Sequence, residues 1–209
     1  MQKYNSFSNI IFDFGGVLLN IDPDKAVNSF KNIGLEDVQL IKNEYRTNGL
    51  FDSLEKGIIS ADEFRSEIRK HICKDVSDKE IDEAWNSMLL DLPYERLELL
   101  SRLKEKHRIF LLSNTNIIHW EAYTGMIRET HGVNLSDFFE KDYYSHDMGL
   151  RKPDTKIYSS VLYKEGLVAE ETLFIDDMFA NVEAARSVGM KGHFLDLDNG
   201  ETVLDLFGN

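Results

Sequence analysis

Three short apolar runs, each followed by polar side chains, are the strongest constraint on the fold of this chain. The runs cover residues 10–12, 108–112 and 172–175, and the side chains that follow them are Asp13, Ser113, Asn114, Asp176 and Asp177. Short runs of β-branched and aromatic residues are typical of buried strands. Because helical segments separate these runs, we expect a parallel α/β sheet with helices on both faces. The strands of such a sheet share a direction, so the three polar ends are expected at one edge.

The rest of the chain outside residues 21–90 continues this alternation. We expect strands at about residues 7–13, 108–112, 142–145, 172–175 and 193–195. Helices are expected at 94–106, from about 117 to 128, after the loop at 149–154, after residue 177 and at 203–206. Pro153 suits the first turn of its helix, where a missing N–H costs little. Residues 1–6 are expected to be a polar lead-in.

Residues 21–90 have a different sequence pattern, because they contain several amphipathic helical stretches and no convincing strand. Asp22 before a proline is typical of a helix start. Ser60 and Ser77 each precede a glutamate by three positions, which is the capping-box pattern. We therefore predict a small all-helical domain at 21–90, inserted after the first strand of a core formed by 1–20 and 91–209.

The polar strand ends indicate a site for a phosphoryl group. Three carboxylates at one sheet edge, those of Asp13, Asp176 and Asp177, would repel each other without a cation. Hard oxygen ligands of this kind suit Mg²⁺. Lys152 stands just before an expected helix N-terminus, and an ammonium and a helix N-terminus both attract a dianion. Ser113 and the backbone amides after it offer further hydrogen-bond donors.

Four motifs in the right order make the chain similar to the haloacid dehalogenase (HAD) superfamily over nearly its whole length. They are residues 12–18, 112–116, Lys152 within 151–153, and 174–177 with Asn181 behind them. The resemblance implies a Rossmann-like core with a small helical cap, in agreement with the pattern above. Residues 51–60 of the insert resemble the bacterial phosphatases that act on α-glucose 1-phosphate, as do residues 113–116 and 148–153.

The resemblance also implies a Mg²⁺-dependent phosphatase of a small phosphorylated metabolite, such as a sugar phosphate or a sugar 1-phosphate. Asp13 would be the nucleophile that forms an aspartyl-phosphate, and Mg²⁺ would be held by Asp13, the Gly15 carbonyl, and Asp176 or Asp177. Of the last two, Asp177 matches the main metal ligand of the family and Asp176 an auxiliary one. The residues implied to bind phosphate are Gly15, Gly16, Ser113, Asn114 and Lys152, of which Ser113 and Lys152 would also be catalytic.

Gly15 departs from the family pattern, because family phosphatases usually carry an acid two residues after the nucleophile. A general acid typically contributes about 10²- to 10⁴-fold to a rate. Three explanations stay open: another group such as Asp22 acts, the leaving group needs less help, as the anomeric hydroxyl of a sugar does, or catalysis is weak. The sugar 1-phosphate phosphatases that the chain resembles also have glycine here, which favours the first two.

Two other functions stay open. A 2-haloacid dehalogenase uses the same nucleophile on carbon and also lacks the second acid. It needs no metal and loses the acidic pair, however, so Asp176 and Asp177 favour phosphate chemistry. A weakly active phosphometabolite-binding protein would also explain Gly15.

The composition of the chain limits the kinds of partner and the location that we expect for the protein. The formal net charge of −13 argues against binding to a nucleic-acid backbone. Cys73 is the only cysteine, so no internal disulfide can form, and we expect it to have no functional role. With no signal peptide and no apolar run long enough to cross a membrane, a cytoplasmic location is expected. The expected partner is a small phosphate ester, and monomer and homodimer are both open.

A few other side chains have weaker functional interpretations. Tyr45, Arg46 and Phe51 are candidates for facing the substrate from the insert. His146 stands near the third motif, and we expect it to be a solvated loop residue. Trp85 is expected in the apolar core because it recurs at helical spacing with its apolar neighbours.

Overall fold

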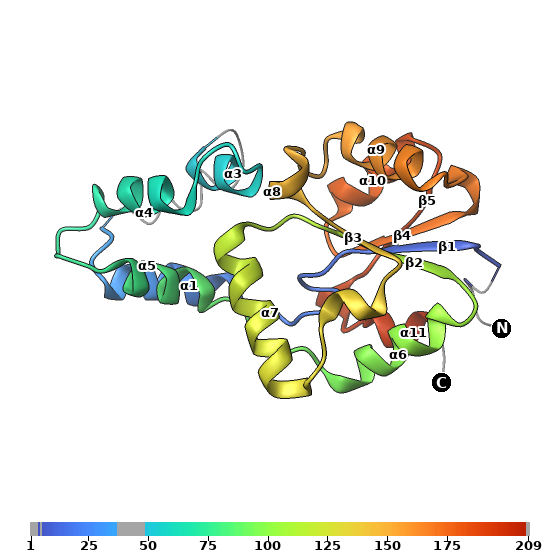
Figure 1. Ribbon diagram of the computed structural model, residues 1–209, viewed down its shortest axis with the longest axis horizontal. Coiled ribbons are helices and arrows are strands. Elements are labelled where there is room, and N and C mark those ends of the chain that lie inside the picture. Colours follow the sequence, from blue (N-terminus) through green and yellow to red (C-terminus); the bar gives the residue numbers. More distant parts are fainter. Residues whose placement is uncertain (1–3, 5, 37–48, 208–209) are drawn as a thin grey trace.

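The computed structural model describes residues 4, 6–36 and 49–207, and a parallel five-stranded sheet lies at its centre (Figure 1). The strands are β1 (Asn9–Phe12), β2 (Arg108–Ser113), β3 (Lys141–Tyr144), β4 (Thr172–Asp176) and β5 (Lys191–Phe194). Their spatial order is β3-β2-β1-β4-β5. The chain winds from β1 outward to β3 and then returns to β4 on the other side of β1. Beyond the carboxyl ends of the strands, such a switch in direction forms a crevice where ligands bind.

Alternate side chains of the central strand enter two separate apolar layers. Ile10 and Phe12 pack in the layer that contains α6 (Tyr94–Lys104) and α11 (Val203–Phe207). Ile11 lies in the opposite layer with α9 (Thr155–Glu165) and α10 (Phe179–Ser187). Figure 1 shows the two pairs of helices on opposite faces of the sheet. The predicted α/β fold with helices on both faces is therefore confirmed.

The regular elements in the described part of the insert are helices, as predicted. Its helices are α1 (Pro23–Asn32), α3 (Leu50–Glu55), α4 (Ala61–Arg69) and α5 (Asp78–Asn86). The predicted helix starts are present, because the Asp22 carboxylate accepts a hydrogen bond from the backbone of α1, and Ser60 and Ser77 each form a capping box. These helices share an apolar cluster of their own, centred on Phe30, Phe51, Phe64 and Trp85.

Two connecting segments join the insert to the sheet region, and they pair with each other. Residues 20–22 and 88–90 run antiparallel and are joined by backbone hydrogen bonds of 2.8 and 2.9 Å. The helix α7 (Ile117–His131) forms a second connection, because Ile118 belongs to the apolar cluster of the insert. The predicted division into 1–20 with 91–209 and 21–90 falls at the paired segments and stays a proposal.

The N-terminal segment differs from the prediction. The first strand was expected from about Phe7, but β1 begins at Asn9. The N–H of Phe7 donates to the carbonyl of Tyr4, so this part of the chain is a turn. Tyr4 itself is buried, and its hydroxyl lies 2.7 Å from Nδ1 of His193. The expected polar lead-in therefore contributes a residue to the core.

Pro153 lies outside α9, so its predicted place in the first helical turn is wrong. The helix begins at Thr155, and the Asp154 carboxylate caps it by accepting the N–H of Lys156 at 3.0 Å. The peptide bond between Lys152 and Pro153 is cis. Other boundaries shift by one to three residues: α6 ends at residue 104 rather than 106, α7 ends at 131 rather than about 128, and β5 covers 191–194 rather than 193–195.

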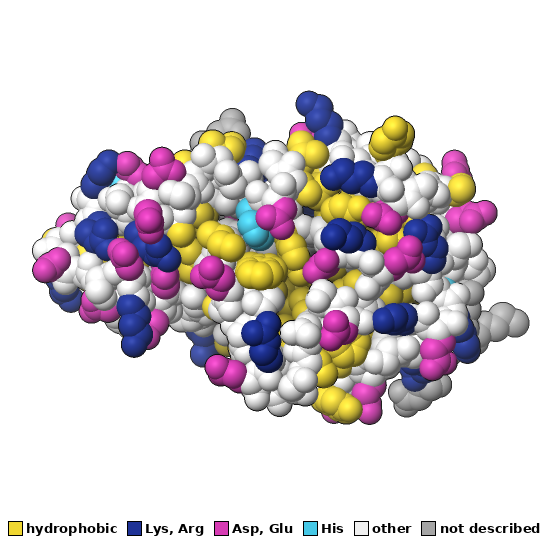
Figure 2. All heavy atoms as spheres, viewed as in Figure 1, with side chains coloured by type: hydrophobic (Ala, Val, Ile, Leu, Met, Phe, Trp, Pro, Cys, Tyr) yellow, Lys and Arg dark blue, Asp and Glu magenta, His cyan; other side chains and the backbone are white. Residues whose placement is uncertain are grey.

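No helix within residues 6–36 or 49–207 has the length and apolar character that a membrane crossing requires. On the face of the molecule in Figure 2, basic and acidic side chains are interspersed over both the insert and the sheet region. Hydrophobic side chains gather between the two regions on that face. On this face, the interspersed charges form no broad basic patch.

Candidate active site

Asp13 and Asp176 lie side by side at the carboxyl ends of neighbouring strands. Phe12 pairs in register with Ile175, so the residues that follow them are level. The N–H of Asp13 donates to the carbonyl of Ile175 at 2.9 Å. Asp177 follows directly, and one carboxylate oxygen from each of the three aspartates lies within 4.8 Å of the others. The structure thus brings the ends of β1 and β4 together as the sequence pattern predicts.

Lys152 is the cation of this acidic cluster. Its side chain is fully buried, and Nζ lies 2.7 Å from an oxygen of Asp13 and 2.7 Å from an oxygen of Asp176. These distances are typical of charge-assisted hydrogen bonds. Burial alone would lower the pKa of Lys152, but the two carboxylates outweigh that effect, and the pKa is raised. The ammonium therefore stays charged between two acids.

The cluster carries more negative than positive charge. Burial raises the pKa of Asp13 above its usual range, Lys152 opposes this in part, and the other two aspartates raise the pKa further. Burial, followed by the charge of Asp176, raises the pKa of Asp177 to about 6. Both shifts express the cost of crowding carboxylates in a poorly solvated place. A divalent cation would remove that cost.

The donor set fits Mg²⁺, because carboxylate oxygens are hard ligands. The Asp176 carboxylate already accepts hydrogen bonds from the N–H of Met178 at 2.7 Å and the side-chain amide of Asn181 at 3.0 Å. Among the described residues, Asp177 takes part in no ion pair. Asp177 and Asp13 therefore have the oxygens best able to hold a cation, while Asp176 orients the lysine.

Gly16 makes room for the carboxylate of Asp177. Its φ is 78°, and a Cβ atom there would lie 2.3 Å from Oδ2 of Asp177, so no other residue fits without displacing the acid. The N–H of Gly16 donates to the carbonyl of Leu19 at 2.9 Å. The amide that was expected to bind phosphate is used inside the turn, and this geometry argues against that role.

An apolar side chain fills the space beside Gly15, where family phosphatases usually have an acid. A Cβ atom at Gly15 would lie 3.3 Å from Cδ1 of Ile21, which is tighter than an ordinary contact. Asp22, the suggested substitute acid, accepts the N–H of Asp24 at 3.1 Å and so caps α1. This bond gives Asp22 a structural use, and a catalytic use stays a prediction.

The end of β2 contributes Ser113 and Asn114. Ser113 is buried and is the last residue of the strand. The side chain of Asn114 holds the backbone of Lys152 at two points: its amide donates to the carbonyl, and its oxygen accepts the N–H, both at 2.9 Å. The carboxamide expected to bind phosphate therefore positions Lys152, a use that the sequence motif did not indicate.

The loop after β2 is held by a serine that the sequence did not single out. The Ser145 hydroxyl donates to the carbonyl of Thr115 at 2.8 Å and accepts its N–H at 2.9 Å. His146 is not solvated as expected, because its side chain is 10% exposed and Nδ1 lies 3.3 Å from the same carbonyl oxygen. Only the position of these residues at the end of a short strand could have suggested this contact.

The aromatic residues in the described part of the insert form its core. Phe51, a candidate for facing the substrate, is 1% exposed, and its ring centroid lies 4.7 Å from that of Trp85. The interpretation of Phe51 as a substrate contact is therefore wrong, whereas Trp85 lies in the core as expected. Tyr45 and Arg46 lie outside the described residues.

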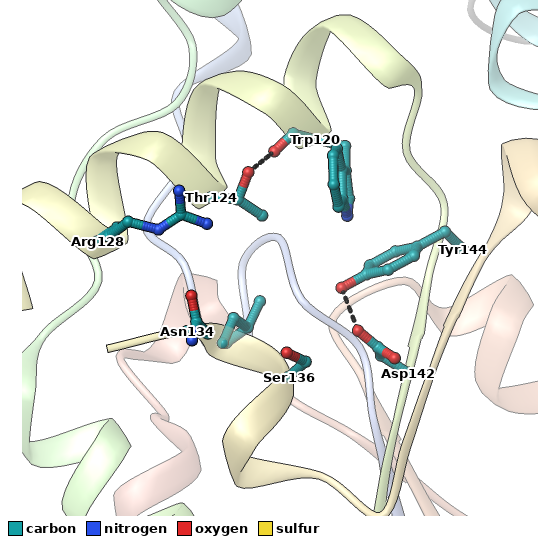
Figure 3. Close-up of a pocket in the computed structure, with 8 residues that line it drawn as sticks. Trp120, Thr124, Arg128, Asn134, Ser136, Asp142 and Tyr144 are labelled. Atoms are coloured by element: carbon teal, nitrogen blue, oxygen red, sulfur yellow. Dashed lines mark hydrogen bonds between the residues drawn. The ribbon is translucent and has the colours of Figure 1, made fainter. Parts of the chain in front are cut away.

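A separate hollow of about 110 Å³ lies between α7 and β3 (Figure 3). It is lined by Trp120, Thr124, Arg128, Asn134, Leu135, Ser136, Asp142 and Tyr144. The hydroxyl of Tyr144 donates to Asp142 at 2.8 Å across one side of it. The hollow contains none of the acidic cluster and is smaller than ordinary ligand pockets, which exceed roughly 300 Å³. The chemistry of the site therefore lies at the sheet edge.

A protein-family comparison supports the four-motif pattern, since a family described as "haloacid dehalogenase-like hydrolase" matches residues 7–189. The chain belongs to the haloacid dehalogenase-like hydrolase family. The resemblance drawn from the motifs is confirmed at this level, and so is the prediction of a hydrolase.

Several haloacid dehalogenase-like relatives cover the chain almost completely. A D-ribitol-5-phosphate phosphatase of Bacteroides thetaiotaomicron is 33% identical over 88% of this chain and 89% of its own length. The sesquiterpene phosphatase astK of Aspergillus oryzae is 31% identical over 96% of this chain and 95% of its own length. A solved HAD family enzyme of Bacteroides thetaiotaomicron, in complex with magnesium and inorganic phosphate, is 39% identical with a TM-score of 0.88. That match covers 97% of this chain and 100% of the solved chain.

Proposed function

We propose that this hydrolase is a Mg²⁺-dependent phosphatase that cleaves a small phosphate monoester through a covalent intermediate on Asp13. The observation that carries the proposal is the cluster of Asp13, Asp176 and Asp177, with oxygens within 4.8 Å of each other and Lys152 in contact with two of them. A phosphate monoester is a dianion, and its binding needs positive charge of the kind that an ammonium and a divalent cation supply. Relatives named as phosphatases support the same reaction class.

The proposed reaction has two steps. A carboxylate oxygen of Asp13 attacks phosphorus, the bond from phosphorus to the leaving oxygen breaks, and an aspartyl-phosphate forms while the leaving oxygen takes a proton from solvent or a nearby acid and departs as the alcohol. Water then attacks this intermediate, which releases inorganic phosphate and restores the carboxylate. Lys152 keeps the nucleophile in place and balances the negative charge of the phosphoryl group. The hydroxyl of Ser113 is proposed to bond a phosphoryl oxygen, as the family resemblance implies.

Magnesium is the proposed cofactor, in agreement with the magnesium complex of the solved relative. When bound, it would neutralise charge on the phosphoryl oxygens and on the nucleophile. Asp13 and Asp177 would hold it, together with the Gly15 carbonyl that the family resemblance implies. Asp176 would orient Lys152 beside them.

The proposed substrates are phosphate esters of small polyhydroxylated compounds. One relative is named for D-ribitol 5-phosphate. Residues 51–60 instead resemble phosphatases of α-glucose 1-phosphate. The two substrates differ in the leaving group, since the anomeric oxygen of a sugar is a weaker base than the oxygen of a primary alcohol. With glycine at position 15, we propose that the ester with the better leaving group reacts faster.

A substrate panel tests the proposal. Ribitol 5-phosphate, α-glucose 1-phosphate and nucleoside monophosphates are incubated with the protein and Mg²⁺, and phosphate release is measured. We expect release that EDTA stops and added Mg²⁺ restores. Asp13→Asn should abolish phosphate release. Asp142 lines the hollow of Figure 3, so Asp142→Asn should leave phosphate release unchanged.

Two outcomes would replace the proposal with another function. Chloride release from 2-chloropropionate in the presence of EDTA would indicate a dehalogenase. Solved dehalogenases resemble the chain at 15 and 16% identity with a TM-score of 0.62, which supports a shared fold only. Binding of phosphate esters without turnover would indicate a binding protein that uses the same site.

We further propose a cytoplasmic protein with a small-molecule substrate and no nucleic-acid partner. The assembly is proposed to be a monomer or a homodimer. Light scattering of the purified protein, with and without Mg²⁺, distinguishes the two.

A further inference from the structure

A partly buried ion pair joins the insert to the loop that carries Lys152. The guanidinium of Arg151 donates from Nε to the carboxylate of Glu55, the last residue of α3. The side chains of Glu55 and Arg151 are 5% and 19% exposed. A second acid, Asp52, lies on the same face of α3, with an oxygen 3.9 Å from Nη1 of Arg151. The insert therefore presents two carboxylates to a single guanidinium.

This ion pair ends one residue away from the lysine of the proposed active site. The backbone of Lys152 is already held on both sides by the carboxamide of Asn114. Its ammonium contacts Asp13 and Asp176 at 2.7 Å each. Because Arg151 is the residue before Lys152, its pairing with α3 restrains the same stretch of backbone from the side of the insert.

A close approach of two backbones supports the same contact. Gly57 follows α3 with a φ of 62°, and a Cβ atom there would lie 2.3 Å from the carbonyl oxygen of His146. His146 belongs to α8 (Ser145–Met148), which faces α3 in Figure 1. Only glycine permits this approach, so the insert is closely fitted to the core where the ion pair forms.

We propose that Glu55 and Arg151 are positioning residues for the phosphatase reaction, because their ion pair fixes the backbone that holds Lys152 on Asp13. This inference rests on the proposed function, since the position of Lys152 affects turnover only if the lysine acts on the phosphoryl group. The helical insert then contributes to the chemical step itself, in addition to covering the substrate.

Steady-state kinetics with p-nitrophenyl phosphate and Mg²⁺ test the inference. The leaving group of this ester needs no proton donor, so its rate does not depend on the general acid that is missing at Gly15. We expect Glu55→Gln and Arg151→Met each to lower kcat by about tenfold to a hundredfold, with a smaller change in KM. The double variant should be no slower than the slower single variant, because both remove one interaction. Arg151→Lys should recover part of the loss.

A second ion pair of the insert provides the matched control. Arg65 bonds Asp82 through Nε and Nη2 at 2.9 and 2.8 Å, entirely within the insert. We expect Arg65→Met and Asp82→Asn to leave kcat unchanged. The inference is overturned if the Glu55 and Arg151 variants keep the kcat of the wild type, or if their effects on kcat simply add.

Failure of the proposed function would be recognised separately, because the wild type would then hydrolyse none of these esters with Mg²⁺. The positioning role is in that case measured by amide hydrogen exchange at Lys152, whose N–H is bonded to Asn114. Faster exchange in Glu55→Gln than in Asp82→Asn supports the positioning role. Equal exchange in the two variants overturns it.

Discussion

His119 is expected to make the stability of the protein depend on pH in the acidic range. It lies in α7, is 6% exposed, and its ring stacks on Trp85 of the insert with centroids 4.5 Å apart and planes at 25°. Its Nε2 lies 3.3 Å from the carbonyl oxygen of Trp85. Burial lowers the pKa of His119 to about 4, and the hydrogen bond to that carbonyl offsets only part of the effect.

The sign and size of the effect follow from proton linkage. The unfolded chain protonates His119 below its ordinary pKa of 6.5, whereas the folded chain does so only near pH 4. The contribution of His119 to the free energy of unfolding is therefore fully present above pH 6.5, and it is lost as the pH falls from 6.5 to about 4. Since one pKa unit corresponds to about 1.4 kcal/mol, the free energy of unfolding should fall by about 3 kcal/mol.

Urea unfolding of the wild type and of His119→Gln, from about pH 7 to about pH 4, isolates this contribution. The glutamine does not titrate, and its amide can still donate to the Trp85 carbonyl. We expect the variant to be less stable near neutral pH, because it lacks the stacked ring. The amount by which the variant is less stable than the wild type should decrease by about 3 kcal/mol between about pH 7 and about pH 4. His71→Gln, at an exposed histidine of the insert, controls for loss of an imidazole.

The outcome depends on the difference in free energy of unfolding between the wild type and His119→Gln at each pH. A difference that stays constant over the whole range would refute the reasoning, because His119 would then titrate alike in the folded and unfolded chains. A deficit that grows at acid pH would show that the folded protein stabilises the imidazolium, which reverses the assigned sign.

Three further predictions concern the metal site and the contact between insert and core. Gly16→Ala should weaken Mg²⁺ binding, measured by calorimetry, because it displaces Asp177. Gly132 has a similar φ of 71°, but a Cβ atom there would have no described atom within 4 Å, so Gly132→Ala should leave Mg²⁺ binding unchanged. Gly57→Ala should lower the melting temperature more than Gly166→Ala, whose φ of 61° matches but whose Cβ would meet no described atom within 4 Å. Added Mg²⁺ should stabilise the wild type, by about 2.7 kcal/mol at a hundredfold excess over Kd, and Asp177→Asn should abolish this gain.

The convergence of the acids could be predicted because it depends on strand direction alone. Apolar runs identify β1 and β4, and in a parallel sheet their carboxyl ends must share an edge. That Asp13 and Asp176 are direct neighbours follows from the pairing of β1 with β4, which strand direction alone does not determine. The helix starts at Asp22, Ser60 and Ser77 were equally accessible, since caps are encoded by residues within one turn of each other.

Contacts between distant segments could not be predicted in the same way. Glu55 and Arg151 are 96 positions apart, and each alone is an ordinary charged residue near a helix or a loop. Phe51 has the same helical spacing whether it faces a substrate or the core of the insert. The carboxamide of Asn114 suits a phosphate or a backbone equally well. In each case the partner is selected by tertiary packing, which the local pattern does not contain.

Gly15 gains a physical meaning only when it is considered with Ile21. A Cβ atom at position 15 would lie 3.3 Å from Cδ1 of Ile21, so a larger residue there would require the isoleucine to shift by a few tenths of an ångström. Ile21 lies in the connecting segment that pairs with Leu89 and joins the insert to the core. The side chain that contacts position 15 thus comes from the segment that leads into the insert. Because glycine at position 15 cannot donate a proton, the proposed reaction depends on a leaving group that departs readily or on an acid from elsewhere.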